Sequence, residues 1–229
     1  AWQDAAGAIA DADGEGHYAR TGIIGFPTAN HDFTRLVGGA RDATQAIVPM
    51  AMILTWPAMP SLYYGDEIGM RYVPGTPELE GSRLGLHYDR AGSRTPMQWG
   101  GLGAEYGPGT PADSRYLPAD PDSAAPTVAA QFADSDSYLH QVRRLIALRR
   151  TDPRLAADAP ITVLATGYPL AYARGADESL LVVLNPSDRP VSQLLPSGEA
   201  ARIVLGRGIE LVDGTVRLDA FGYAVLDLS

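Results

Sequence analysis

A short apolar run, a stretch of apolar residues at helical spacing and a second short apolar run follow one another early in this chain. The two runs, 22–26 and 61–64, have the length of buried strands, and apolar residues recur every three or four positions between them, over 43–54. Pro49 lies inside that stretch, where it either kinks the helix or marks a late start. A strand, a helix and a strand in this order predict a parallel βαβ unit and an α/β architecture.

Polar residues follow both predicted strands. Asn30, His31 and Asp32 come after the first strand, and Asp66 and Glu67 come after the second. Functional groups of parallel sheets collect at the carboxyl ends of the strands. The two polar clusters are therefore the first candidates for a functional site.

The next region, from about 74 to 133, is rich in Gly, Pro, Asp and Ser. A segment of this length without regular structure is usually either functional or disordered. It contains the sequence Arg-Thr-Pro-Met-Gln-Trp at 94–99. An amphipathic helix is predicted after it, over about 135–150, and Pro153 ends this helix.

The last seventy residues change to short β-like runs separated by turn sequences such as Asp213-Gly214. About seven such strands predict an antiparallel β-sandwich. We therefore divide the chain into residues 1–159 and residues 160–229. The predicted strands cover 161–164, 170–172, 180–184, 201–205, 209–212, 216–218 and 223–228.

Composition excludes several classes of function. The chain has 229 residues and a net charge of −9, and all its basic residues are Arg, so it is a poor candidate for binding nucleic acid or an anionic membrane. The absence of Cys excludes disulfides and thiolate metal sites, and the four His have no metal-ligand spacing, so we expect neither a metal nor another cofactor. No signal peptide or membrane span is evident, which predicts a cytoplasmic protein, although a chain without an initiator Met is expected to be processed or part of a longer one.

Three segments together resemble glycoside hydrolase family 13, the α-amylase family. They are Phe-Pro-Thr-Ala-Asn-His-Asp at 26–32, Tyr-Tyr-Gly-Asp-Glu-Ile-Gly-Met at 63–70 and the segment at 94–99. The third segment is similar to the α-glucosidase-like branch, which includes oligo-1,6-glucosidases, sucrose isomerases and trehalose synthases. The resemblance implies a (β/α)8 barrel followed by an antiparallel β-sandwich, domain C.

A barrel of this kind takes about 250 residues, whereas only about 150 precede the predicted sandwich. The resemblance implies that they match the seventh and eighth barrel strands, so that the first six strands, with the nucleophilic Asp and the acid/base Glu, have no counterpart. We therefore expect the C-terminal part of the barrel, completed by an N-terminal barrel segment or protected by self-association.

The resemblance also assigns roles to residues. Asp32 is expected to stabilise the transition state, and His31 and Arg94 are expected to bind the sugar. Arg35 is expected to lie near Asp32, keep it ionised and assist substrate binding. No calcium site is visible.

Each assignment has a structural alternative. The Asn-His-Asp triplet is also typical of an Asx-turn, and Arg94 could form a structural ion pair. A structural role is favoured for Asp66 and Glu67, and a solvated pair for Asp89 with Arg90. The aromatic residues Tyr63, Tyr64 and Trp99 are more typical of core or rim than of a sugar platform.

Three functions follow from these expectations. The first is the C-terminal portion of a retaining α-glucoside hydrolase that acts on oligosaccharides or disaccharides. The second is a transglycosylase or isomerase similar to trehalose synthase. The third is a non-catalytic module that associates with carbohydrate.

Overall fold

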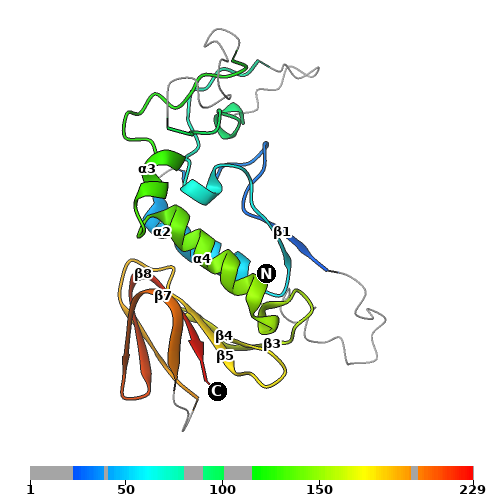
Figure 1. Cartoon of the computed structure of the whole chain (residues 1–229), viewed down its shortest axis with the longest axis vertical. Helices are drawn as coiled ribbons and strands as arrows, with labels where there is room; N and C mark the ends of the chain where they lie inside the picture. Colours follow the sequence, from blue (N-terminus) through cyan, green and yellow to red (C-terminus); the bar gives the residue numbers. More distant parts are fainter. Residues whose placement is uncertain (1–22, 39–40, 80–89, 101–114, 197–200, 229) are drawn as a thin grey trace. The chain divides into compact units, whose positions relative to one another are not determined.

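The computed structural model describes residues 23–38, 41–79, 90–100, 115–196 and 201–228 (Figure 1). These residues form two compact units. One unit holds 27–38, 41–47 and the described residues of 61–143, and the other holds 23–26, 48–60 and the described residues of 144–228.

Strands β1 (Gly25–Pro27) and β2 (Met59–Ser61) pair in a two-stranded sheet. The N–H of Met59 donates to the carbonyl of Ile24, and the N–H of Thr28 donates to the carbonyl of Ser61, both at 2.9 Å. Residue numbers rise together on the two strands, so the pair is parallel, as the βαβ pattern predicts. The second strand lies before its predicted position at 61–64, and the chain then turns at Gly65, whose φ of 85° favours glycine.

Helix α2 (Ala43–Thr55) connects the two strands and contains Pro49 in its interior. The helix begins six residues before the proline, so a late start at Pro49 is excluded. The carboxylate of Asp42 accepts the N–H of Gln45 at 3.0 Å and thereby caps the first turn. Ile47, which lies on the apolar stripe, has no exposed surface.

Two arginines bind carbonyl groups at the end of α2 and just after it. Arg149 donates to the carbonyl oxygens of Leu54 and Trp56 at 3.0 and 2.9 Å, and Arg174 donates to that of Thr55. These carbonyls lack partners within the helix, and cations stabilise the negative end of its dipole. Burial lowers the pKa of Arg174 to about 10, so this guanidinium stays charged at neutral pH.

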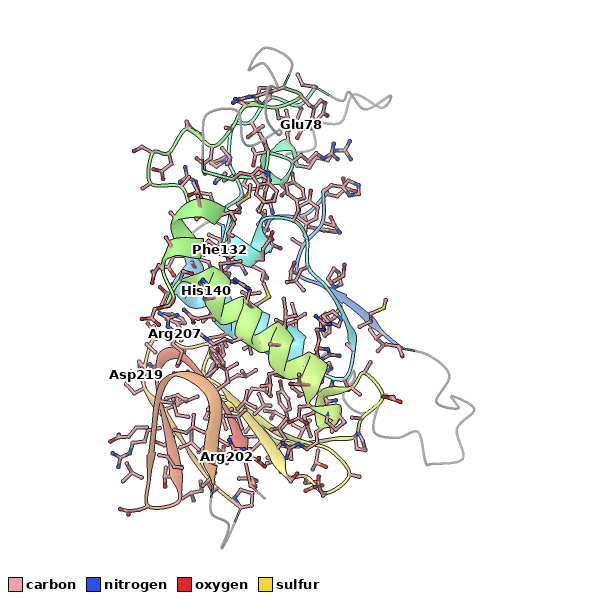
Figure 2. The ribbon with its side chains drawn as sticks, in the orientation of Figure 1. Glu78, Phe132, His140, Arg202, Arg207 and Asp219 are labelled. Carbon is pink, nitrogen blue, oxygen red and sulfur yellow. The ribbon has the colours of Figure 1, made fainter. Side chains whose placement is uncertain are left out.

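Two further helices lie in the second half of the chain. The helix predicted over 135–150 is confirmed as α4 (Tyr138–Thr151). Helix α3 (Val128–Ala133), which the composition did not predict, is capped by Thr127, whose hydroxyl accepts the N–H of Ala130 at 3.2 Å. Phe132 of α3 and His140 of α4 are labelled in Figure 2, and the centroids of their rings are 5.7 Å apart.

The C-terminal strands form an antiparallel sheet, as predicted, with the order β3-β4-β5-β8-β6 and with β7 also paired to β8. In the described residues the six strands belong to one hydrogen-bonded sheet rather than to two. The strands are β3 (Ile161–Thr166), β4 (Leu170–Arg174), β5 (Leu180–Leu184), β6 (Val191–Leu194), β7 (Arg202–Val212) and β8 (Thr215–Asp227).

The two longest strands each join two predicted ones. β8 pairs with β6 over its first part and with β5 over its last, and it passes through Phe221 at a φ of 55° between them. A Cβ at Gly222 would lie 2.9 Å from the carbonyl of Arg207, so only glycine fits beside β7 there. The predicted breaks are thus irregularities within continuous strands. No helix among the described residues is long and apolar enough to cross a membrane.

Candidate functional site

Asp32 lies in a loop that Asn30 shapes. The side-chain oxygen of Asn30 accepts the backbone N–H groups of Asp32 and Phe33 at 2.8 and 3.1 Å. This is the Asx-turn that the Asn-His-Asp triplet allows, and it follows β1 directly. The turn uses the side chain of Asn30 and leaves the carboxylate of Asp32 for other contacts.

Two arginines and a histidine surround the carboxylate of Asp32. Its Oδ1 accepts from Arg90 at 2.9 Å and from Arg94 at 3.1 Å, and its Oδ2 lies 3.3 Å from Nε2 of His31. Arg94 also donates through Nε to the carbonyl of His31 at 3.0 Å. The structure thus brings His31, Asp32 and Arg94 together, while 44% of the Asp32 side chain remains exposed.

The charges around Asp32 favour its ionised form. Desolvation acts to raise the pKa of Asp32, but the hydrogen bond from Arg90, the charges of His31 and Arg90 and the bond from Arg94 outweigh it. Together they hold this pKa below its ordinary value. Asp32 is therefore a carboxylate at neutral pH and a hydrogen-bond acceptor only.

The expectation that Arg35 supports Asp32 and binds substrate is wrong in this structure. Arg35 has no exposed surface, and its guanidinium donates to Oδ1 of Asp66 at 3.3 Å and to the carbonyl groups of Tyr64 and Ser93 at 2.5 and 3.0 Å. The rings of Tyr63 and Tyr64 each lie 4.8 Å from the same guanidinium. A buried guanidinium needs a buried carboxylate, and Asp66 supplies it.

Asp66 has the structural role that the sequence favours. Its side chain is buried and accepts the hydroxyl of Thr28 at 2.6 Å in addition to Arg35. The same hydroxyl accepts the N–H of Tyr63 at 2.9 Å. Burial raises the pKa of Asp66, which the bonds from Thr28 and Arg35 partly offset. This network joins the segment after β1 to the segment after β2.

Arg90 is the site residue that the sequence reasoning missed. Its partner in the predicted solvated pair, Asp89, lies outside the described residues, and Arg90 itself contacts Asp32. The available signal was its position four residues before Arg94, since two side chains this close along the chain can reach one carboxylate. Between the two arginines lies a short turn, the 3-10 helix η3 (Ala91–Ser93).

The aromatic residues mostly have structural contacts. The hydroxyl of Tyr64 donates to the carbonyl of Thr95 at 2.7 Å, and the ring of Tyr63 lies 4.7 Å from that of Tyr64. Trp99 is half exposed. Among the described residues, no group of three or more His, Asp or Glu side chains could hold a metal ion.

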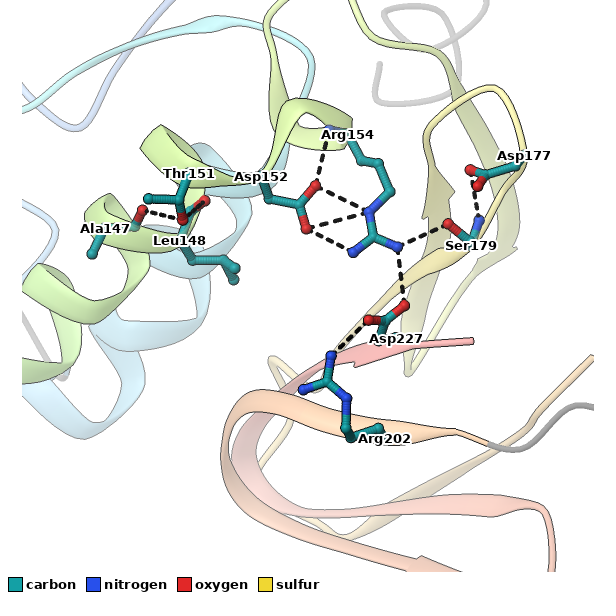
Figure 3. A network of polar contacts seen from close by, with 9 residues as sticks. All are labelled: Ala147, Leu148, Thr151, Asp152, Arg154, Asp177, Ser179, Arg202 and Asp227. Atoms are coloured by element: carbon teal, nitrogen blue, oxygen red, sulfur yellow. Dashed lines mark hydrogen bonds and ion pairs between the residues drawn. The ribbon is translucent and has the colours of Figure 1, made fainter. Parts of the chain in front are cut away.

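Figure 3 shows a second polar network, which lies beside a surface pocket of about 500 Å³. Arg154 donates to Asp152, Asp227 and Ser179, at distances between 2.8 and 3.2 Å, and Arg202 donates to Asp227 at 2.7 Å. Both oxygens of Asp152 and all three nitrogens of Arg154 are engaged within the network. It therefore holds the end of α4 to the sheet and offers few groups to a ligand.

Comparison with known proteins agrees with the motifs. Residues 17–158 match the model of the alpha amylase catalytic domain. A trehalose synthase/amylase TreS of Mycobacterium tuberculosis is 35% identical over 158 residues, which are 65% of this chain and 24% of that protein. A probable alpha-glucosidase of Rhizobium meliloti is 27% identical over 208 residues, which are 85% of this chain and 37% of that protein. The chain thus spans well under half the length of these relatives.

Solved structures have the same fold. The trehalulose synthase MutB from Pseudomonas mesoacidophila superposes with a TM-score of 0.72 and 22% identity over 91% of this chain and 43% of that one. A glucose complex of a MutB variant superposes with a TM-score of 0.75 over the whole of this chain and 46% of that one. The family match covers more than half of the sequence, and the chain belongs to the alpha-amylase family.

Proposed function

We propose that this chain is the C-terminal portion of a retaining α-glucoside hydrolase, incomplete without a segment that carries the nucleophile and the acid/base. The observation that carries the proposal is the ionised carboxylate of Asp32, held by Arg90 and Arg94 beside His31. Its expected substrates are oligosaccharides or disaccharides with α-glucosidic bonds. The names of the relatives, alpha-glucosidase and oligo-1,6-glucosidase, support this class of substrate.

The proposed architecture follows from the family. Residues 1–159 would be the C-terminal part of a (β/α)8 barrel, about its seventh and eighth strands, and residues 160–229 would be domain C, a β-sandwich. The parallel pair β1–β2 supports the barrel assignment, and the antiparallel pairing of β3–β8 supports a C-terminal β-domain, although these six strands form one hydrogen-bonded sheet. Asp32 would then follow a barrel strand at its carboxyl end, where barrel enzymes hold their active sites.

Retaining hydrolysis needs two carboxyl groups about 5–5.5 Å apart, one as nucleophile and one as acid/base, around an oxocarbenium-like transition state. Asp32 would be a third carboxylate that accepts hydrogen bonds from sugar hydroxyls. Oδ1 of Asp32 accepts hydrogen bonds from the two arginines, whereas Oδ2 lies 3.3 Å from Nε2 of His31. These bonds would strengthen as the sugar ring distorts, which lowers the barrier rather than only tightening binding.

Reconstitution tests the proposal. The purified chain is assayed on p-nitrophenyl α-glucoside alone and after addition of the N-terminal part of the R. meliloti alpha-glucosidase. We expect no turnover by the chain alone, turnover by the mixture, and a loss of about 10²–10³-fold with Asp32→Asn because one preorganised transition-state contact is removed. The control is Asp136→Asn, whose carboxylate lies in an exposed turn outside the Asp32 cluster and is expected to retain activity. Turnover by the isolated chain would contradict the proposal whether or not it survives Asp32→Asn, because these residues would then supply the nucleophile and the acid/base themselves.

Trehalose-synthase-like transfer is the second candidate. Trehalose synthases from Mycobacterium tuberculosis, Thermus thermophilus and Pimelobacter are 35–36% identical to this chain, against 27% for the alpha-glucosidase. Products formed from maltose distinguish the two reactions: trehalose indicates transfer, and glucose alone indicates hydrolysis. A mixture that binds oligosaccharide without turnover would favour the third function, a non-catalytic module.

A further inference from the structure

The two arginines that hold Asp32 belong to one short turn, and a carboxylate from outside this turn binds its backbone. Oε1 of Glu78 accepts the N–H of Arg90 at 2.7 Å and the N–H of Ala91 at 2.6 Å. Arg90 precedes η3, and its own side chain does not cap that helix. Glu78 therefore satisfies N–H groups that the start of η3 leaves without a helical partner.

The rest of the turn is also held tightly. The N–H of Val73 donates to the carbonyl of Gly92 at 3.1 Å, and a Cβ at Gly92 would lie 2.3 Å from the carbonyl of Val73. The hydroxyl of Ser93 donates to the carbonyl of Phe33 at 2.6 Å. The beginning of the turn, where Arg90 lies, is fixed by Glu78, whose side chain Figure 2 labels.

Fixing this backbone matters for the Arg90–Asp32 pair. The two residues are 58 positions apart, and 24% of the Arg90 side chain and 44% of the Asp32 side chain are exposed. A partly exposed ion pair gains little unless its long side chain starts from a fixed backbone, because ordering that side chain costs entropy.

We propose that Glu78 is a positioning residue of the candidate site, which holds the guanidinium of Arg90 against Asp32 by binding the backbone of the turn. The inference rests on the proposed role of Asp32, because Glu78 touches neither Asp32 nor a substrate in this scheme. Arg90 carries the charge, and Glu78 determines where that charge lies.

The test is a titration of the Asp32 carboxyl carbon by ¹³C NMR in the full chain. Glu78→Asp keeps the negative charge but is one methylene shorter and cannot reach both N–H groups, so the pKa of Asp32 should rise. Glu78→Ala should also raise it, although loss of a nearby negative charge by itself would lower the pKa. Glu78→Gln keeps an acceptor oxygen and should restore most of the wild-type pKa of Asp32.

The control is Glu210→Gln. The carboxylate of Glu210 lies on the surface, 3.6 Å from Arg217, and its replacement should leave the titration of Asp32 unchanged.

Combination with Arg90→Gln shows whether Glu78 acts through Arg90. Arg90→Gln alone should raise the pKa of Asp32, and Glu78→Asp in that background should add nothing further. A pKa of Asp32 that is unchanged or lowered in both Glu78→Asp and Glu78→Ala would overturn the proposal. So would pKa shifts that add in the variant that combines Glu78→Asp with Arg90→Gln.

A second readout works at neutral pH, where acid unfolding plays no part. ¹⁵N relaxation of Nε of Arg90 should show greater mobility in Glu78→Asp than in the wild type, and equal mobility would count against positioning. Neither measurement needs turnover. If the reconstituted enzyme is inactive but the pKa of Asp32 shifts as predicted in the Glu78 variants, only the proposed function is refuted. If the enzyme is active but the pKa does not shift, only the role of Glu78 is refuted.

Discussion

Three arginines near the candidate site differ in role because their surroundings differ. Arg35 is buried and pairs with Asp66, whereas Arg90 and Arg94 are partly exposed and pair with Asp32. The guanidinium of Arg35 donates through its two terminal nitrogens to one carboxylate and two carbonyl groups, while its buried Nε has no partner. Removal of either member of the Arg35–Asp66 pair would leave the other buried without its countercharge. The guanidinium groups of Arg90 and Arg94 instead hold the carboxylate of the candidate site.

Removal of Arg35 should therefore be costly for stability. Arg35→Met leaves Asp66 buried without its charged partner, and we expect a loss of about 3–5 kcal/mol in the free energy of unfolding, measured by urea denaturation. Arg35→Met combined with Asp66→Leu should recover part of that loss. The matched surface variant Arg217→Gln should cost about 1 kcal/mol or less, and an equal cost for the two arginines would contradict this assignment.

Asp152 should contribute a pH dependence to stability. The hydrogen bond from Arg154 holds the pKa of Asp152 below its ordinary value despite desolvation (Figure 3). Because this pKa is lower in the folded than in the unfolded chain, the stabilisation is present above about pH 4 and is lost as the pH falls below that value.

Asp152→Asn should lower stability at neutral pH and flatten the loss of stability on acidification. Urea midpoints measured at several pH values between about 2.5 and 7 check this expectation. Asp188→Asn serves as the control, since its carboxylate is exposed and 3.7 Å from Arg189. Parallel curves for wild type and Asp152→Asn would show that Arg154 does not stabilise Asp152.

At the scale of elements, the site is built from the segment after β1 and the turn η3. The loop holding Asp32 is fixed by Asn30, and the turn is fixed by Glu78 and by the close approach of Gly92 to Val73. The strands end where the site begins, so the sheet provides the rigid part and short irregular segments provide the functional groups.

Gly92→Ala tests this construction. A Cβ at position 92 would lie 2.3 Å from the carbonyl of Val73 and 2.7 Å from the ring of Tyr72, so the backbone of η3 must move. We expect a loss of about 1–3 kcal/mol in stability and a rise in the pKa of Asp32, because both arginines move with the turn. Gly167→Ala, where nothing lies within 4 Å of the added Cβ, is the matched control. A neutral Gly92→Ala would show that the turn is not held as described.

At the scale of the whole molecule, the sheet that β1 and β2 form has no further strand among the described residues. Ile23 and Ile24 next to β1 and Met59 in β2 are 59%, 49% and 60% exposed. Each of the two strands has one edge without a partner strand among the described residues, and exposed apolar side chains beside such an edge favour association with another chain. The proposed missing segment would cover them, as would self-association.

The isolated chain should therefore self-associate, and sedimentation velocity should show a larger species at increasing concentration. Ile24→Lys with Met59→Lys should reduce that species, because charged residues on an edge oppose pairing. The matched variant Leu164→Lys with Leu194→Lys places the same charges on exposed positions of the C-terminal sheet and should reduce it less. A monodisperse wild-type monomer would instead favour the non-catalytic module.

The sequence by itself determined the features that depend on near neighbours. Helical spacing predicted α2 and α4, apolar runs and turn residues predicted most of the C-terminal strands, and three motifs indicated the family and named His31, Asp32 and Arg94. Periodicity, capping and turn formation act over a few residues, so a single sequence carries them.

Only the tertiary structure decided which arginine meets which carboxylate. Arg90 and Arg94 reach Asp32 across 58 and 62 positions, whereas Arg35, three residues from Asp32, turns instead to Asp66. The tertiary structure also showed that predicted short strands join into β7 and β8, since cross-strand pairing continues through local irregularities. Burial and charge pairing depend on distance in space rather than along the chain. For this reason proximity in sequence misled for Arg35, and the spacing of Arg90 and Arg94 alone did not show that both meet Asp32.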